Sequence, residues 1–557
     1  MSKAIVKIVL LLSLIVCSTT AKGEEREFAL PFDFPILLSG NFAELRSNHF
    51  HGGVDFKTQG VINKPIHAPA DGYISRATVS PGGYGNALYI THYNGYTTVY
   101  GHLESFTDDI AARVRERQYS EETFAVDLSF KQDEYPVRRG DVVAMSGNTG
   151  YSFGPHLHFE IRETESGELI NPLLFYKEYV KDSKAPKAYA LSIHPRPGKG
   201  CVNGKNRKQV QKIGGNSPKE TFRAWGEVGF GIKALDFMDN TANNYGLYTI
   251  ELRADGKLLY SSRMDRVAFN ENRLINAWVD YEAYYLRGEW FMRSHLLDNN
   301  PLRLLSTDNS RGWLTIDEER TYDIEYTLSD IHGNTSRYRF AVKGERCEIP
   351  DVDSQGAQYF RWDTDNELRD LGMRLKIPKG ELFEDAILDI RRIEKPDAIS
   401  DRYNLNGITY PLWRGCEIAI QLKGTPSVNT EKLYIRRVTS SGGYGIGGSC
   451  KDGWISASIS SLGIYEAAID TTPPTVRDLT KGKNGILTFY IADGETGVKS
   501  YKGYIDGEFK LFRFSSKNVR LTCNLKNEGV RRGRHTLRLV VTDRAGNETI
   551  HEKRFTY

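Results

Sequence analysis

The sequence lacks two features that would point to particular partners: a large excess of charge and a long apolar segment. Its 74 lysine and arginine residues nearly balance 71 aspartate and glutamate residues, which gives a formal net charge of +3. So small a charge argues against nucleic acid as a partner. The N-terminal apolar run, Ile8 to Val16, is too short to span a bilayer, so no transmembrane segment is expected in the mature chain.

The same N-terminal run has the form of a secretory signal. Lys3 and Lys7 precede the apolar residues, and small residues follow as far as Ala21. Cleavage after Ala21 would remove residues 1–21, so we expect an exported protein in the periplasm or cell envelope. Cys17 offers a lipid anchor as the less favoured alternative, because Val16 stands where such signals have a small residue.

Cysteine is scarce and forms no CxxC motif. After cleavage the chain retains Cys201, Cys347, Cys416, Cys450 and Cys523. An odd number leaves at least one thiol unpaired in an oxidising compartment, and closeness in sequence favours a pair between Cys416 and Cys450.

Histidine, by contrast, is concentrated near the N-terminus. Of the 12 histidines, one early stretch contains His49, His51, His67, His92, His102, His156 and His158. The candidate chemistry therefore lies in this stretch. His67, at the start of a short strand in HAPADG, is expected to be structural.

The segment HFHGGVDF, residues 49–56, combines imidazole and carboxylate groups. Gly52 and Gly53 are poor helix formers, so His51 and Asp55 are expected to meet across a loop and a strand. This pair of ligand types favours zinc or a similar transition metal over calcium. His49 shares a strand face with His51 if the segment is extended, and a polar surface turn is the alternative interpretation.

A second segment, GNTGYSFGPHLHFEIR, residues 147–162, runs from a glycine-rich loop into an alternating strand. Residues two apart in a strand share a face, so His156 and His158 point the same way, while Leu157 and Phe159 face the core. Two parallel imidazoles favour a metal site, although one or both could be structural.

A third candidate comes from a predicted hairpin around Asn94-Gly95. This dipeptide predicts a two-residue type I′ turn, which places Ala87 opposite His102 and puts His92 on the other face. His102, at the end of a strand, is therefore the better candidate for a site, and His92 is expected to be packed or on the surface.

These segments, with APADGYI, GGYGNALYITH, YGHL and VRRGDVVAMSGNTG in the same order, resemble the lysostaphin and LytM type zinc metallopeptidases over about residues 30–178. The resemblance implies an antiparallel β domain with an open groove and one Zn²⁺ per chain. It implies His51, Asp55 and His158 as zinc ligands and His102 and His156 as catalytic histidines, and it leaves His49 outside the ligand set.

The stretch Glu104 to Pro136 is longer than the family's usual connection. It predicts a charged helix and a strand, which would either wall one end of the groove or form a surface insertion. There is no HExxH motif, so a glutamate base of the thermolysin kind is not offered.

Beyond residue 181 the sequence predicts β-sandwich modules. Residues 322–342 and 535–555 share a strand, a D-x-x-G-N turn and a second strand, as in two Ig-like copies. The expected fold is mainly β, with a peptidase domain at 22–181 and further modules at 182–346, 347–469 and 470–557.

The function that the resemblance implies is zinc-dependent hydrolysis of peptide cross-links in bacterial peptidoglycan during cell-wall remodelling. The C-terminal modules would position the enzyme or bind another wall protein. One alternative is an inactive LytM-like activator of another wall hydrolase, which would have lost ligands. Another is a surface binding or scaffold protein in which the modules are the functional part.

Overall fold

The computed structural model describes residues 28–557, apart from 216, 219, 350, 352–356, 425–427 and 482–484. The signal peptide expected at residues 1–21 lies outside the described residues. Strands account for 51% of the structure and helices for 8%, which confirms the mainly β fold class. In the described part of the chain, no helix has both the length and the apolar character needed to cross a membrane.

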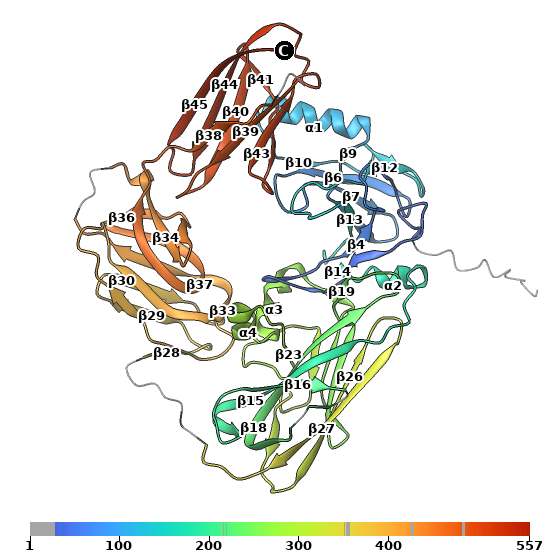
Figure 1. Ribbon diagram of the computed structural model, residues 1–557, viewed down its shortest axis with the longest axis vertical. Coiled ribbons are helices and arrows are strands. Elements are labelled where there is room, and N and C mark those ends of the chain that lie inside the picture. The colour runs from blue at the N-terminus through green and yellow to red at the C-terminus, as the bar shows by residue number, and fades with distance from the viewer. Residues whose placement is uncertain are drawn as a thin grey trace, which may run out of the picture.

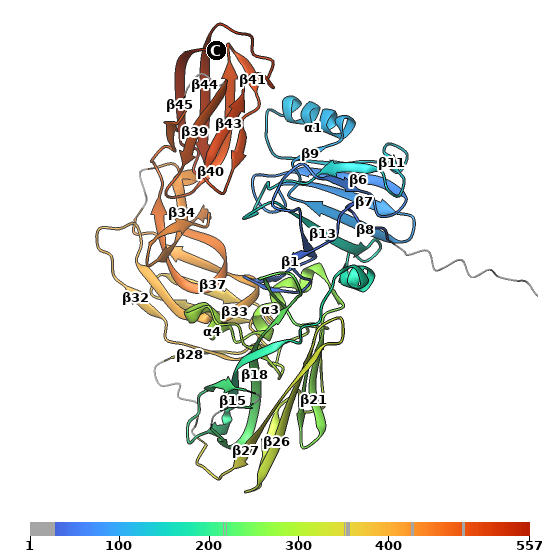
Figure 2. The same ribbon diagram turned by 45° about the vertical axis from the view of Figure 1, so that its right-hand side comes forward.

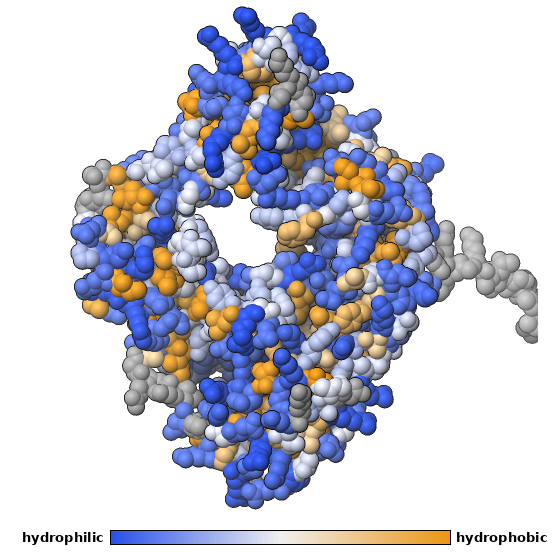
Figure 3. All heavy atoms as spheres, in the orientation of Figure 1, coloured by the Kyte–Doolittle hydropathy of each residue, from blue (hydrophilic) through white to orange (hydrophobic). Residues whose placement is uncertain are grey.

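Four domains follow one another around a ring (Figure 1, Figure 2). Each has its own hydrophobic core. The fourth domain lies next to the first, so contacts between these two domains close the ring. The space-filling view shows an opening through the centre of the ring (Figure 3).

The N-terminal domain is built on an antiparallel sheet. In spatial order its strands are β1 (Leu38–Gly40), β4 (Val54–Lys57), β13 (His156–Glu163), β8 (Tyr96–Gly101), β7 (Asn86–His92), β6 (Gly72–Val79) and β10 (Val126–Ser129). A smaller sheet holds β5 (Pro65–His67), β12 (Val142–Met145) and β9 (Ser105–Phe106). Leu157 and Phe159 are fully buried, as strand alternation predicts, which leaves the opposite face of β13 for polar side chains.

The remaining elements of this domain are short, apart from one helix. They are β2 (Leu45–Arg46), β3 (His49–Phe50), β11 (Pro136–Val137), β14 (Leu169–Ile170), α1 (Asp108–Ser120), α2 (Leu173–Tyr176) and the 3₁₀ helix η1 (Lys177–Tyr179). Helix α1 and strand β10 are the helix and strand predicted within Glu104 to Pro136.

The predicted register of the β7–β8 hairpin is wrong by one residue. Tyr89 pairs with Val99 and Ile90 with Thr98, so Ala87 is not opposite His102. The cause is the turn: Gly95 has φ +87° while Asn94 keeps a negative φ, and the connection has three residues instead of two.

The second domain is joined to the first through a shared sheet edge. Strand β14 pairs with β22 (Arg266–Val267), so the N-terminal sheet continues into the second domain. The longer strands here are β15 (Lys187–Val202), β16 (Gln209–Gly214), β18 (Phe222–Phe237), β20 (Thr249–Ala254), β21 (Lys257–Arg263), β26 (Thr321–Ser329) and β27 (Thr335–Gly344). Its helices are η2 (Phe269–Leu274), α3 (Ile275–Trp278) and α4 (Tyr281–Arg287).

The third and fourth domains complete the ring. The third is organised around β29 (Asn366–Asp370), β30 (Met373–Ile377), β33 (Arg402–Gln421), β34 (Leu433–Thr439), β36 (Ser449–Lys451) and β37 (Trp454–Ile469). The fourth has one sheet of β38 (Thr475–Asp478), β39 (Ile486–Ala492), β43 (Arg520–Asn524) and β42 (Arg513–Ser515). Its second sheet holds β41 (Glu508–Lys510), β40 (Val498–Ile505), β44 (Arg534–Asp543) and β45 (Glu548–Thr556), and an apolar core lies between the two.

The predicted pairing of Cys416 with Cys450 is wrong. Cys416 and Cys450 are free, and the disulfide joins Cys201 to Cys347 in the second domain. Cys416 lies on β33 opposite Ile459 of β37, whereas Cys450 lies on β36 opposite Ile455 of the same strand. Ile455 also pairs with Ile420 of β33, so β33 and β36 lie on opposite sides of β37. Neighbouring strands are about 4.8 Å apart, so Cys416 and Cys450 are separated by about two such spacings, which is more than a disulfide can span.

The insertion closes the ring. Arg115 of α1 donates to both carboxylate oxygens of Glu528, at 3.1 and 3.2 Å, and Glu122 accepts from Lys502 and Tyr504, both at 2.8 Å. None of the described residues from 104 to 136 lines the groove discussed below. The insertion therefore serves as a contact surface for the fourth domain and does not wall the groove.

Candidate metal and catalytic site

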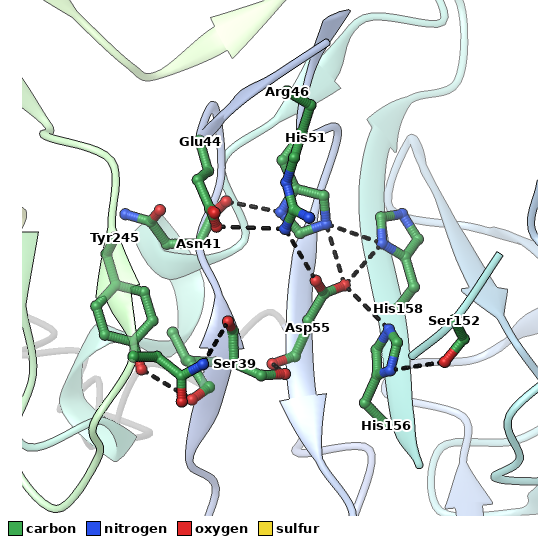
Figure 4. A network of polar contacts seen from close by, with 12 residues as sticks. Ser39, Asn41, Glu44, Arg46, His51, Asp55, Ser152, His156, His158 and Tyr245 are labelled. Atoms are coloured by element: carbon green, nitrogen blue, oxygen red, sulfur yellow. Dashed lines mark hydrogen bonds and ion pairs between the residues drawn. The ribbon is translucent and has the colours of Figure 1, made fainter. Parts of the chain in front are cut away.

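Three buried side chains meet at the polar face of the N-terminal sheet (Figure 4). His51 Nε2 and His158 Nδ1 each lie 3.0 Å from Asp55 Oδ1 and 3.0 Å from each other. The three residues expose only 6 to 8% of their surface. Two imidazoles and one carboxylate, brought together from separate segments, form a candidate metal site whose donor types suit zinc.

The backbone fixes two of these ligands side by side. In the pairing of β4 with β13, Asp55 lies directly opposite His158. The strands approach closely at Gly53, where a Cβ atom would lie 2.2 Å from the carbonyl oxygen of Phe159. Only glycine fits there, so the GG in HFHGGVDF permits the loop that carries His51 to turn into β4.

Hydrogen bonds outside the ligand set fix the orientation of both imidazoles. His51 Nδ1 lies 2.7 Å from the carbonyl oxygen of Asn41, so Nδ1 is the donor and Nε2 keeps its lone pair for a metal. His158 Nε2 lies 2.9 Å from Glu160 Oε1, which leaves Nδ1 as the ligand atom in the same way.

The electrostatics of the site favour a positive charge at its centre. Burial would raise the pKa of Asp55, but the adjacent His51 and His158 outweigh burial and hold that pKa well below its usual range. For His158 burial lowers the pKa, yet Asp55 and Glu160 raise it to about 9. Glu160 is fully buried, and Arg162 and His158 keep its pKa at about 2 despite burial. Two buried carboxylates therefore flank the imidazole nitrogens, a charge arrangement that suits a cation.

Two further histidines face this cluster. The His156 ring lies with its centroid 4.7 Å from that of His102, and His156 Nε2 is 3.6 Å from Asp55 Oδ1. His102 Nδ1 donates to the carbonyl oxygen of Thr149 at 2.9 Å, and His156 Nδ1 donates to that of Gly154 at 2.8 Å. Each ring thus keeps Nε2 free to accept a proton.

The position of His102 depends on a backbone feature. Strand alternation alone would place it on the core face with Tyr100 and Thr98, the face that also carries His92. At His102, however, φ is +62°, and this left-handed conformation just beyond β8 turns the side chain toward the ligands. The expectation that His102 and His92 would be separated therefore holds, but the turn at His102 separates them and the predicted register does not.

The other early histidines lie apart from the ligand cluster. His92 is buried in the core, where Nε2 bonds to Thr98 Oγ1 at 2.7 Å, and burial lowers its pKa to about 4. His67 bridges Asp33 and the carbonyl oxygen of Gly140. His49 bonds to the carbonyl oxygen of Ser47.

Comparisons with known proteins assign two segments of the chain to known families. Residues 49–119 match the model of peptidase family M23, and residues 357–470 match the model of the Zu5-like domain. Lipoprotein NlpD of Yersinia enterocolitica is 32% identical over 116 residues, which cover 21% of this chain and 93% of NlpD. The chain belongs to peptidase family M23.

Two other relatives share this M23 domain. DD-carboxypeptidase/endopeptidase Mpg of Neisseria meningitidis is 36% identical over 130 residues, 23% of each chain. Peptidoglycan DD-endopeptidase ShyB of Vibrio cholerae is 32% identical over 111 residues, 20% of each chain. The present chain therefore spans about a fifth of the length of these curated relatives.

The groove of the M23 domain is completed by other domains. It has a volume of about 1380 Å³ and contains all five predicted site residues among its lining. The second domain contributes Phe269, Asn272 and Arg273, and the third contributes Trp413 and Arg414. Arg273 also donates to the carbonyl oxygen of Leu412, so the two added walls are joined to each other.

The second domain also supports the ligand loop. The Phe50 ring, next to His51, lies 5.9 Å from the Trp278 ring, and Phe42 and Phe50 belong to the core of the second domain. The M23 ligand loop is therefore packed against residues far along the chain.

Sequence reasoning missed Glu160 and its partners. Glu160 accepts hydrogen bonds from His158, from the Tyr84 hydroxyl at 2.5 Å and from Arg162 Nε at 2.7 Å. Strand alternation could have identified it, since Glu160 follows His156 and His158 at spacings of two on the same face. Tyr84 and Asn41 carried no comparable signal, because their loops reach the site only in the fold.

Proposed function

We propose that this M23 protein is an exported zinc endopeptidase that hydrolyses peptide cross-links of bacterial peptidoglycan. The observation that carries the proposal is the convergence of three buried ligand atoms with two further imidazoles in one groove. The similarity to Mpg, a DD-carboxypeptidase/endopeptidase, and to ShyB, a peptidoglycan DD-endopeptidase, supports the same reaction class. The signal-like N-terminus supports a periplasmic or cell-envelope location.

Each residue has a defined part in this reaction. His51, Asp55 and His158 would hold the zinc ion through Nε2, a carboxylate oxygen and Nδ1. Zinc in such a site supplies a Lewis acid and lowers the pKa of a bound water to about 7. His102 and His156 accept or deliver protons through Nε2 as water attacks and the amine leaves, because their Nδ1 atoms are engaged by backbone carbonyls.

Neutral imidazoles fit these proton transfers. Burial, with the neighbouring His156 and His158, lowers the pKa of His102 to about 3, and burial also lowers that of His156. Both rings are therefore neutral near pH 7, so each Nε2 presents a lone pair.

The third domain takes part in substrate selection. Trp413 and Arg414 lie at the groove wall that faces the M23 domain, and the Arg414 guanidinium lies 5.0 Å from the Trp413 ring centroid. An aromatic surface beside a cation suits a polymer that carries sugar rings and carboxylates. Peptidoglycan offers both, so the third domain would bind substrate away from the bond that is cut.

The test is digestion of purified peptidoglycan sacculi by the full-length protein, followed by analysis of the released muropeptides. Loss of cross-linked species with the appearance of new amino and carboxyl ends is expected. An intact cross-link profile from metal-loaded protein would overturn the proposal and favour an activator of another wall hydrolase. Tight binding to sacculi without cleavage would instead favour a surface binding or scaffold protein.

A further inference from the structure

The second and fourth domains repeat more than their hairpin turns. In the turn Asp330 to Asn334, Asp330 Oδ1 accepts from the Asn334 backbone, and Asn334 Nδ2 donates to the carbonyl oxygen of Asp182 at 3.1 Å. Asp543 accepts from the Asn547 backbone in the same way. Asn547 Nδ2 likewise donates to the carbonyl oxygen of Asp470 at 3.1 Å. In each domain the turn asparagine thus links the turn aspartate to an aspartate at the start of the domain. The linked aspartates are Asp330 and Asp182 in the second domain, and Asp543 and Asp470 in the fourth.

Asp182 and Asp470 differ in the hydrogen bonds that their carboxylates accept. Asp470 Oδ2 accepts from Thr496 Oγ1 at 2.6 Å, and Oδ1 accepts from the Thr472 backbone at 3.1 Å. Asp182 Oδ1 accepts from the Lys184 backbone at 3.0 Å, but Asp182 Oδ2 is buried and has no hydrogen-bond partner among the described residues. An unpartnered carboxylate oxygen in a side chain with 0% exposure is costly unless something positive meets it.

An imidazole points at this oxygen. His332, in the turn of the second domain, donates through Nε2 to the carbonyl oxygen of Lys177 at 3.0 Å, so its Nδ1 carries the lone pair. Nδ1 is also buried and unpartnered in the described structure, and it lies 3.7 Å from Asp182 Oδ2. That separation is too long for a hydrogen bond, yet it is close to the distance between two ligands of one ion, each about 2 Å from it.

The surrounding charge is negative. One carboxylate oxygen of Asp330, one of Asp182 and one ring nitrogen of His332 all lie within 4.8 Å of one another. Asp236 is 2% exposed, and its Oδ1 has no partner among the described residues. Burial raises the pKa of Asp236 to about 8, and the charges of Asp330 and Asp182 add to the increase. Asp236 is therefore neutral near pH 7, and the negative charge at the cluster comes from Asp182 and Asp330.

We propose that Asp182, Asp330 and His332 bind a second divalent transition-metal ion, of the zinc or manganese kind, at the junction between the M23 domain and the second domain. Two carboxylates and one imidazole suit such an ion better than calcium, which prefers more oxygen ligands. The equivalent place in the fourth domain holds three carboxylates, those of Asp470, Asp493 and Asp543, but no imidazole, because Ala545 occupies the place of His332. Thr496 already donates to Asp470 there, so we assign the ion to the second domain alone.

Binding there would fix the geometry of the groove. The ion ties the linker at Asp182 to the β26–β27 hairpin, and His332 is already bonded to Lys177 at the end of the M23 domain. The second domain also supplies Phe269 and Arg273 to the groove wall. The inference itself does not depend on peptidase activity.

The test counts metal ions on the full-length protein. Parent, His332→Ala, His158→Ala and the double variant are stripped with a chelator, reloaded with Zn²⁺ or Mn²⁺, desalted and measured by mass spectrometry. We expect about two ions in the parent, one in each single variant and none in the double variant. His535→Ala, a remote imidazole bonded to Asp506 in the fourth domain, is the control that keeps both.

The variant is chosen to fold, because the fourth domain already carries alanine at the equivalent turn position. Added metal should raise the Tm of His158→Ala, and this increase should be absent from the double variant. Metal content in His332→Ala equal to that of the parent would overturn the second site. If the peptidase site fails instead, His158→Ala will retain the parent's metal content while His332→Ala still loses one ion.

Discussion

Replacing Glu160 with glutamine tests whether the buried carboxylate behind His158 sets the metal affinity. Glu160 accepts from His158 Nε2, the Tyr84 hydroxyl and Arg162 Nε, all of which are donors. Glutamine keeps the size but removes the charge, and its NH₂ group must face at least one of these donors. The His158 ring should be held less firmly and should bind metal more weakly, while His51, Asp55 and His158 all remain present as ligands.

The expected loss follows from the class of contact. Removing a partner that orients a metal-bound histidine typically costs about 10- to 100-fold in metal affinity. This corresponds to about 1.4 to 2.7 kcal/mol. Zinc affinity is measured by competition with a chromogenic chelator, and kcat on peptidoglycan is measured at saturating zinc. We expect a weaker zinc affinity with kcat largely restored by excess metal.

Glu163→Gln provides the matched control. Glu163 ends the same strand and bonds to Ser166, outside the ligand cluster. It should bind zinc like the parent. If Glu160→Gln, folded to the same extent, also binds zinc as tightly as the parent, the orienting role assigned to Glu160 is refuted.

Three further outcomes follow from the site and its surroundings. His102→Ala should keep its zinc but lose about 10² to 10⁴ in rate, whereas His92→Ala should keep both apart from any loss of stability; metal analysis beside peptidoglycan cleavage distinguishes them. Because burial lowers the folded-state pKa of His92 to about 4, its stability contribution is present above pH 6.5 and lost as pH falls toward 4. Between pH 7 and pH 5 the free energy of unfolding of the parent should therefore fall by about 2 kcal/mol more than that of His92→Gln. Equal decreases in the two proteins would refute this. Trp413→Ala should raise KM for polymeric peptidoglycan about two- to tenfold with little change in kcat, as the loss of one aromatic contact implies; Trp454→Ala, which packs on Arg374 outside the groove, should not.

Local rules predicted the part of the site that lies on one strand. The alternation of β13 is enough to put His156 and His158 on one face and Leu157 and Phe159 in the core. The ligand pair in HFHGGVDF was also accessible, because two glycines exclude a helix. That the chain is an M23 protein was accessible from the order of its motifs.

The errors arose where the outcome depends on a single backbone angle or on distant packing. The turn around Gly95 and the left-handed conformation at His102 each changed the hairpin, and neither can be read from a dipeptide preference. The disulfide joins Cys201 to Cys347 across 146 residues, a pairing that proximity in sequence could not indicate.

The ring and the groove formed by several domains also depend on contacts between residues far apart in the sequence. Helix α1 was predicted as an element, but its partner Glu528 lies in another domain, 413 residues from Arg115. The support that Trp278 gives to the ligand loop likewise appears only when the second domain packs against the first. Site residues inside the M23 motifs could therefore be predicted, while the residues that complete the groove could not.

We propose that a metal ion held by His51, Asp55 and His158 is required to cut peptidoglycan. The most direct test measures metal content and cleavage of purified peptidoglycan together, for the parent, Asp55→Ala and His158→Ala. We expect both variants to lose the ion of this site and all cleavage, since each removes a ligand from a site with three. His158→Ala that cleaves peptidoglycan at the parent's rate would contradict it, and a parent that holds the ion but cuts nothing would show that the site is not catalytic.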